Sequence, residues 1–192
     1  MDLLAGIFSA FGLSASAGLN AYIPLLVVAL LARFTNLITL SSPWDNLTSW
    51  WMIGLLLILS LVEFFADKFP AVNHINDALQ TFVRPAAGAI VFAASAGIIT
   101  EIHPVLSLAA GLFVAGSVHA VKSIAVRPLV TVTTAGAGNT PISILEDIVS
   151  TLVSIFSILI PIFMGIALLL LFAWAFFRLR RRNRKQEWKS YL

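Results

Sequence analysis

The chain has 192 residues, of which 59% are hydrophobic and 11% charged, and its mean hydropathy is +0.97. Soluble domains carry about 25% charged residues, so this composition excludes an ordinary soluble protein and indicates an integral membrane protein. The sequence contains no cysteine, which excludes disulfides, thiolate metal sites and cysteine nucleophiles.

Five apolar stretches predict an all-α, polytopic membrane fold with about five transmembrane segments. They cover residues 3–34, 50–66, 85–102, 104–127 and 148–177. The first is too long for one untilted span at a rise of about 1.5 Å per residue. Its polar cluster from Ser14 to Asn20, followed by Pro24, predicts a kink, a break or a re-entrant hairpin. Pro161 interrupts the last stretch, which is of similar length.

The two halves of the chain resemble each other. Residues 5–10 (AGIFSA) are echoed by residues 110–115 (AGLFVA), and the spacing of Pro70 and Asp77 is echoed by Pro141 and Asp147. We expect one transmembrane domain over residues 1–177, built from an inverted repeat with halves 1–103 and 104–177. In a fold of five spans, the first and fourth stretches run in opposite directions. Chance similarity between apolar segments is the alternative.

Small residues recur every four positions in two of the apolar stretches. These residues are Ala10, Ser14 and Gly18 in the first, and Ala89, Ala93 and Gly97 in the third. In a bilayer, small side chains allow helix backbones to approach closely. The pattern predicts tight helix packing, either within the chain or at a homodimer interface.

A basic tail of residues 178–192 follows the last apolar stretch. It contains seven of the twelve Lys and Arg residues, so the rest of the chain has five basic and eight acidic residues. A basic cluster at this position predicts a cytoplasmic C-terminus. It also suits anionic lipid headgroups, which we favour over nucleic acid as its partner.

Charge is concentrated in residues 63–84, EFFADKFPAVNHINDALQTFVR. From Pro70, apolar and polar residues alternate with helical spacing and predict an amphipathic helix that ends at Arg84, before Pro85. Its polar face carries Asp77 and Arg84. The helix either lies flat in the membrane interface or re-enters the protein with its polar face toward a water-filled cavity.

A second group of charges lies in residues 122–147 and partly matches this segment in the second half of the expected repeat. Together the two groups define a candidate binding site. Its residues are Asp67, Asp77, Arg84, Lys122, Arg127, Glu146 and Asp147. Charges within apolar helices are costly and usually pair or face a cavity. Taken singly, each residue also fits the simpler role of marking the end of a span.

The sequence carries no pattern that predicts an enzyme, a metal site or a cofactor. His74, Asp77 and His119 lack the close spacing of metal ligands, and no GxSxG motif is present. The glycine-rich segment 131–141 lacks the Lys of a phosphate-binding loop. It fits a flexible connector, with an unwound, ion-binding stretch as the alternative.

Four segments resemble a family of bacterial multipass membrane proteins known as domain of unknown function 4126. They are GLNAYIPLL (18–26), EFFADKFPAVNHINDALQ (63–80), RPAAGAI (84–90) and HAVKSIAVRPLVT with GNTPISILEDI (119–148). The resemblance implies a small inner-membrane protein with an internal repeat. It brings no activity, so no functional residue is carried over from it.

The leading functional hypothesis is a small transporter or channel-like permease. Asp77 and Asp147 would bind a cation or proton, and Arg84, Lys122 and Arg127 would hold an anionic group of the substrate. The alternative is a non-catalytic scaffold or lipid-binding accessory protein that uses the amphipathic helix and the basic tail. An intramembrane enzyme would need a convergent catalytic cluster, for which the sequence has no signature.

Overall fold

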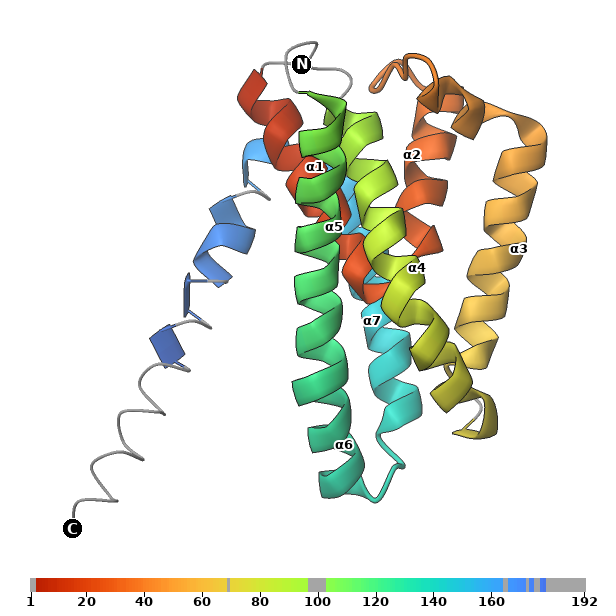
Figure 1. Ribbon diagram of the computed structural model, residues 1–192, viewed down its shortest axis with the longest axis vertical. Helices are drawn as coiled ribbons and strands as arrows, with labels where there is room; N and C mark the ends of the chain where they lie inside the picture. The colour runs from red at the N-terminus through yellow and green to blue at the C-terminus, as the bar shows by residue number, and fades with distance from the viewer. Residues whose placement is uncertain are drawn as a thin grey trace.

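The computed structural model describes residues 3–68, 70–96, 103–163, 166–171, 173–174 and 177–178, and the described residues are helical with short connections. The chain contains α1 (Leu3–Leu19), α2 (Tyr22–Phe34), the 3-10 helix η1 (Trp44–Thr48), α3 (Trp50–Ala66), α4 (Pro70–Ala96), α5 (Pro104–Val121), the π-helix η2 (Lys122–Val126), α6 (Arg127–Thr134) and α7 (Asn139–Leu159) (Figure 1).

The first apolar stretch is broken, as the sequence predicts. Helix α1 ends at Leu19 and α2 begins at Tyr22, and Figure 1 shows them as two arms of a hairpin whose open ends lie at the same end of the molecule. Asn20 stabilises the break, because its Oδ1 accepts hydrogen bonds from the backbone N–H groups of Tyr22 and Ile23 at 3.1 and 3.0 Å. Pro24 follows within the first turn of α2, where a missing N–H costs little.

Three described helices are long and apolar enough to cross a membrane: Ala78–Ser95, Pro104–Thr134 and Asn139–Leu159. Helices α1, α2 and α3 are shorter apolar helices. The chain therefore has the helices of a membrane protein, whereas the five predicted spans stay a prediction. Helices α1 and α5 both run away from the end marked N in Figure 1. The expected opposite direction of these two segments is wrong, and the repeat stays a prediction.

The predicted end of the amphipathic helix before Pro85 is wrong. Helix α4 continues from Pro70 through Pro85 to Ala96 and joins this segment to the third apolar stretch. Its exposed face carries Leu79 and Phe82, with 61% and 79% of their surface accessible, whereas Gln80 and Arg84 are buried. The polar face of α4 therefore points into the protein. This is the expected orientation in a membrane, where buried charges face the protein interior and apolar residues face lipid.

Small residues hold α1, α4 and α5 together, as their spacing predicts. A Cβ atom on Gly111 would collide with the backbone oxygen of Gly88, and one on Gly18 would lie 2.6 Å from the backbone oxygen of Ala115. Ser14 Oγ donates a hydrogen bond to the carbonyl oxygen of Gly111 over 2.8 Å. These contacts lie within one chain. Gly97 lies outside the described residues, and the homodimer stays a prediction.

Helix α7 turns a stripe of serines toward α1. Ser150 and Ser154 are fully buried, and the hydroxyl of Ser16 lies 2.8 and 2.7 Å from theirs. The outer face of α7 carries exposed residues such as Leu145 and Leu152. Polar residues inside and apolar residues outside are the reverse of the pattern in a soluble bundle. Helix α7 ends at Leu159, just before Pro161, so the predicted interruption of the last stretch is confirmed.

Candidate functional site

Six buried charged side chains form one continuous chain of ion pairs with alternating sign. In spatial order they are Glu63, Arg84, Asp67, Arg127, Glu146 and Lys122, and we call them the ion-pair chain. They come from α3 and the residue after it, α4, η2, the start of α6, and α7. Three are acidic and three basic, so these six described side chains carry no net formal charge.

Glu63 and Arg84 form the most deeply buried pair, with 1% and 0% of their side-chain surfaces accessible. Arg84 Nη2 and Nε lie 2.9 and 3.3 Å from Glu63 Oε1. Arg84 Nη1 lies 3.3 Å from His119 Nδ1. Because an arginine can only donate, Nδ1 of His119 accepts, and the imidazole proton lies on Nε2. Removing one member of such a buried pair typically costs about 3–5 kcal/mol of folding free energy.

Asp67 is the centre of the ion-pair chain. Its Oδ2 atom lies 3.6 Å from Arg84 Nη2 and 3.4 Å from Arg127 Nη2. Oδ1 of Asp67 accepts a hydrogen bond from Asn76 Nδ2 at 2.6 Å, and Oδ2 accepts one from Ser143 Oγ at 3.3 Å. These contacts join the end of α3 to α4, α6 and α7. The carboxylate therefore fixes the relative positions of four segments.

The π-helix η2 brings Lys122 and Arg127 to the same carboxylate. Glu146 Oε2 lies 2.8 Å from Lys122 Nζ and 2.9 Å from Arg127 Nη2. The backbone N–H of Arg127 bonds to the carbonyl of Lys122, five residues earlier, so the two side chains lie near one face. Pro128 favours this wider turn, since its ring would clash with the carbonyl four residues earlier in an α-helix.

The two ends of the ion-pair chain bind the two sides of the helix break. Lys122 Nζ donates a hydrogen bond to the carbonyl oxygen of Leu19 over 2.9 Å. Glu63 Oε2 accepts one from the backbone N–H of Ala21 over 3.1 Å. The C-terminal end of a helix carries partial negative charge and the N-terminal end partial positive charge. Each end of the break therefore faces a side chain of opposite charge.

A further pair, Lys68 and Asp147, lies beside the break, with Lys68 Nζ 3.4 Å from Asp147 Oδ2. Asp147 Oδ1 accepts a hydrogen bond from Asn20 Nδ2 over 3.0 Å, so Asn20 links this pair to the break. Lys68 also donates to the carbonyl oxygen of Phe64 over 2.8 Å. Both members of the pair are slightly exposed, unlike Glu63 and Arg84.

The structure brings six of the seven predicted site residues together: Asp67, Arg84, Lys122, Arg127, Glu146 and Asp147. The side chain of Asp77, the seventh, lies outside the described residues. Sequence reasoning missed Asn20 and Lys68 as site residues and treated Glu63 as the end of a span. The spacing of Glu63 and Asp67, one helical turn apart, was a usable signal, because both carboxylates meet Arg84.

Gln80 adds an unpaired acceptor to the polar face of α4. It lies one turn from Asn76, which donates to Asp67, and one turn from Arg84, a member of the ion-pair chain. Only 3% of the surface of Gln80 is accessible. Its Oε1 atom is buried and has no hydrogen-bond donor among the described residues. A buried amide oxygen without a donor is costly, so this position suits a ligand or a water molecule.

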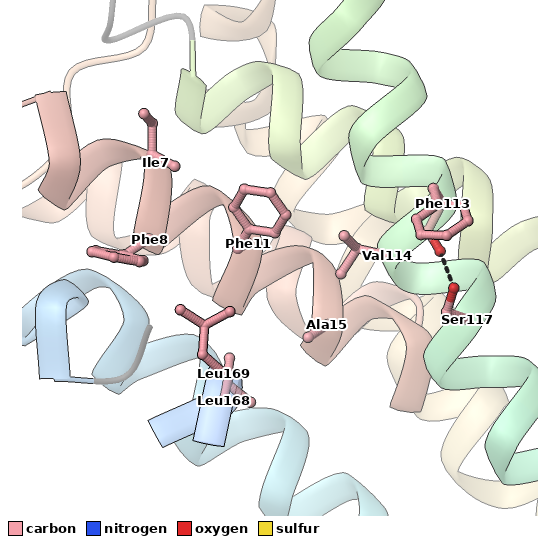
Figure 2. A pocket seen from close by; sticks show the side chains of 9 residues that line it. All are labelled: Ile7, Phe8, Phe11, Ala15, Phe113, Val114, Ser117, Leu168 and Leu169. Atoms are coloured by element: carbon pink, nitrogen blue, oxygen red, sulfur yellow. Dashed lines mark hydrogen bonds between the residues drawn. The ribbon is translucent and has the colours of Figure 1, made fainter. Parts of the chain in front are cut away.

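A separate cavity of about 530 Å³ lies against α1 and α5 (Figure 2). It is lined by apolar side chains of α1 and α5, and by Leu168 and Leu169. The hydroxyl of Ser117 at its edge donates to the carbonyl oxygen of Phe113 over 2.7 Å. No side chain of the ion-pair chain lines this cavity, and its lining suits an apolar group such as an acyl chain.

Within the described part of the chain, no three His, Asp or Glu side chains are grouped closely enough to hold a metal ion. The acidic side chains described above instead face Lys, Arg or backbone N–H groups. Residues 179–192 lie outside the described residues. The cytoplasmic position of the basic tail and its contact with anionic lipids therefore stay predictions.

Comparison with known proteins gives a family and no activity. Neither a curated protein nor a solved structure matches the chain. The model of a family described as domain of unknown function (DUF4126) matches residues 7–182, which include every residue of the ion-pair chain. The match confirms the resemblance seen in the sequence, and the chain belongs to the DUF4126 family.

Proposed function

We propose that the chain is a small membrane permease for a polar solute or ion, with its binding site at the break between α1 and α2. One observation carries the proposal: the two ends of a buried ion-pair chain bind the C-terminal end of α1 and the N-terminal end of α2, where the hairpin turns. In many transporters the ends of interrupted helices point their backbone dipoles at the substrate. Such irregular backbone is tolerated at membrane depth where it is buried in protein or lines a water-filled cavity.

The ion-pair chain suits a site that changes partners during transport. Each of its six side chains contacts a charged side chain or a backbone group of another segment. A segment can therefore move if one of these contacts is replaced by another. Asp147, and by the sequence pattern Asp77, would bind a cation or proton, and Arg84, Lys122 and Arg127 an anionic group. The motion would tilt one half of the chain against the other.

Flux measurements in liposomes test this proposal. The purified chain is reconstituted, and uptake of labelled alanine, methanesulfonate and rubidium is compared with protein-free liposomes, while a pH-sensitive dye reports proton flux. We expect one of these fluxes to exceed the background and to be lost in Arg84→Gln. Arg33→Gln is the matched control, because Arg33 is exposed and lies outside the ion-pair chain. Flux at background for every probe would overturn the proposal.

A lipid-binding accessory protein is the second candidate. The cavity between α1, α5 and Leu168 favours it, because an apolar lining suits a lipid acyl chain. This function predicts lipid that co-purifies with the chain and no solute flux. Substitution of Ala15 by Trp would fill the cavity and reduce the bound lipid, whereas Arg33→Gln, at an exposed position, would leave the bound lipid unchanged.

The expected cellular setting belongs to the same proposal. We place the chain in an inner membrane with its C-terminus in the cytoplasm, where the basic tail meets anionic lipids. Labelling of single cysteines tests the orientation cleanly, because the natural chain has none. A cysteine introduced at Ser190 should react only from the cytoplasmic side. Crosslinking in the membrane tests the homodimer.

A further inference from the structure

The helix break holds one ammonium group and one carboxylate group of the protein itself. The ammonium of Lys122 lies 2.9 Å from the carbonyl oxygen of Leu19, and the carboxylate of Glu63 lies 3.1 Å from the backbone nitrogen of Ala21. Only Asn20 separates these two backbone groups in the chain. A ligand that replaces both side chains must therefore carry two opposite charges a few atoms apart, as an α-amino acid does.

Both side chains keep a partner when they leave the break. In the structure Lys122 Nζ also lies 2.8 Å from Glu146 Oε2, and Glu63 Oε1 lies 2.9 Å from Arg84 Nη2, so each side chain has a second partner besides the break. If both side chains left the break, neither charge would be unpaired. An unpaired buried charge is the main cost of breaking a buried ion pair, so this cost is avoided. The ion-pair chain can thus give up its two end contacts and keep all five of its internal ones.

Charge balance narrows the class of ligand. The ion-pair chain and the Lys68–Asp147 pair each carry equal numbers of acidic and basic groups. A lone cation or anion at this buried position would add an uncompensated charge, which a low-dielectric site disfavours. A zwitterion adds none. Its carboxylate also suits the amide end of α2, and its ammonium suits the carbonyl end of α1.

A second observation points to a ligand beside the ion-pair chain. The buried Oε1 atom of Gln80 has no donor among the described residues, and Gln80 lies between Asn76 and Arg84 on the polar face of α4. An ammonium or amino group is the donor that this oxygen lacks. The Oε1 atom of Gln80 is therefore an available hydrogen-bond acceptor on the same face of α4 as Arg84.

We propose that the break between α1 and α2 binds a small zwitterion whose ammonium and carboxylate groups are attached to the same carbon atom, as in an α-amino acid. The ligand displaces Lys122 from Leu19 and Glu63 from Ala21, and Gln80 accepts a hydrogen bond from it. The inference rests on the proposed permease function and names the substrate class of the same site. Because the ligand is neutral overall, its transport does not move net charge unless an ion accompanies it.

Alanine, acetate and methylammonium are the probes, because each of the two ions carries one of the two charged groups of alanine. In wild-type protein, we expect millimolar alanine to raise the melting temperature in detergent, and acetate and methylammonium to have no effect. Labelled alanine should enter liposomes at a rate that is independent of an imposed membrane potential. Arg33→Met is the control variant, since Arg33 lies on the surface.

Two substitutions locate the binding site. Gln80→Ala should weaken alanine binding by about tenfold, the effect of losing one hydrogen bond in a buried site. Lys122→Met removes the ammonium at Leu19 and leaves the ion-pair chain with an excess negative charge. Methylammonium should then raise the melting temperature of this variant, although it leaves that of the wild type unchanged.

The outcomes separate the inference from the proposed function. If acetate or methylammonium stabilises the wild type as much as alanine does, the proposal of a zwitterionic ligand is wrong. Flux of an ion would in that case still support the permease function. Alanine binding that is unchanged in both Gln80→Ala and Lys122→Met would place it elsewhere and overturn the site. If Lys122→Met does not fold, the wild-type probes and Gln80→Ala still decide. Background flux for every probe would overturn the permease itself.

Discussion

Asn20 and Asp147 are 127 residues apart in the sequence, and Asn20 Nδ2 donates a hydrogen bond to Asp147 Oδ1 over 3.0 Å. The other side-chain atom of the same amide, Oδ1, accepts from the backbone of α2. The side chain of Asn20 thus caps the start of α2 and also links the helix break to α7. The amide of Asn20 therefore connects the carboxylate of Asp147 to the start of α2.

Asn20→Ala should destabilise the fold by about 1–3 kcal/mol. The substitution removes a helix cap, typically about 1 kcal/mol, and one of the buried hydrogen bonds of Asp147. Unfolding in detergent, followed by circular dichroism, measures the loss. Asn46→Ala is the matched control, because Asn46 is exposed and its side-chain amide donates to the carbonyl oxygen of the nearby Pro43. Equal losses in the two variants would contradict a special role for Asn20.

Glu63→Gln should be among the most destabilising single substitutions, at about 3–5 kcal/mol, because it removes the charge that faces a fully buried arginine. The double variant Glu63→Gln, Arg84→Met should recover a large part of this loss, since no unpaired charge remains at the pair. A double-mutant cycle on unfolding free energies gives the coupling. Additive effects of the two substitutions would show that the pair is not coupled. Asp45→Asn controls for loss of an exposed carboxylate.

Asp147→Asn should abolish flux and change stability by less than about 1 kcal/mol. An asparagine keeps an acceptor for Asn20, and Lys68, with 14% of its side-chain surface accessible, reaches solvent more easily than a buried cation. Liposome flux and detergent unfolding are measured on the same preparation. The hypothesis of a binding carboxylate at this position fails if flux is unchanged. We predict the same loss of flux for Asp77→Asn from the sequence pattern.

Part of the site could be predicted because charge is so scarce. Outside the basic tail the sequence has five Lys and Arg residues, and four of them lie in the ion-pair chain or in the pair beside it. In an apolar chain such residues must either sit at a span end or find partners. Sequence spacing revealed the charges and the break near Asn20, but it could not show which acid meets which base.

The continuity of α4 and the π-helix could not be predicted by local rules. A proline disfavours the helix before it, yet α4 passes through Pro85, because packing against α1 and α5 outweighs this preference. Near Pro128 the chain adopts a π-turn, which shifts all later side chains by one position relative to an α-helix. Pro128 disfavours an α-helical turn here but does not by itself select a π-turn, and the wider turn brings Arg127 to Glu146.

Close backbone contact between α4 and α5 leads to a last prediction, a pair of glycine substitutions with opposite results. A Cβ atom on Gly111 would lie 2.6 Å from Phe92 Cβ and 2.7 Å from Ala89 Cα, whereas one on Gly54 has no neighbour within 4 Å. Gly111→Ala should therefore destabilise the fold by about 1–3 kcal/mol through overpacking. Gly54→Ala should stabilise α3 by up to about 1 kcal/mol, because alanine is the better helix former. Melting temperatures in detergent decide between them, and a neutral Gly111→Ala would show that the helices lie further apart than the structure has them.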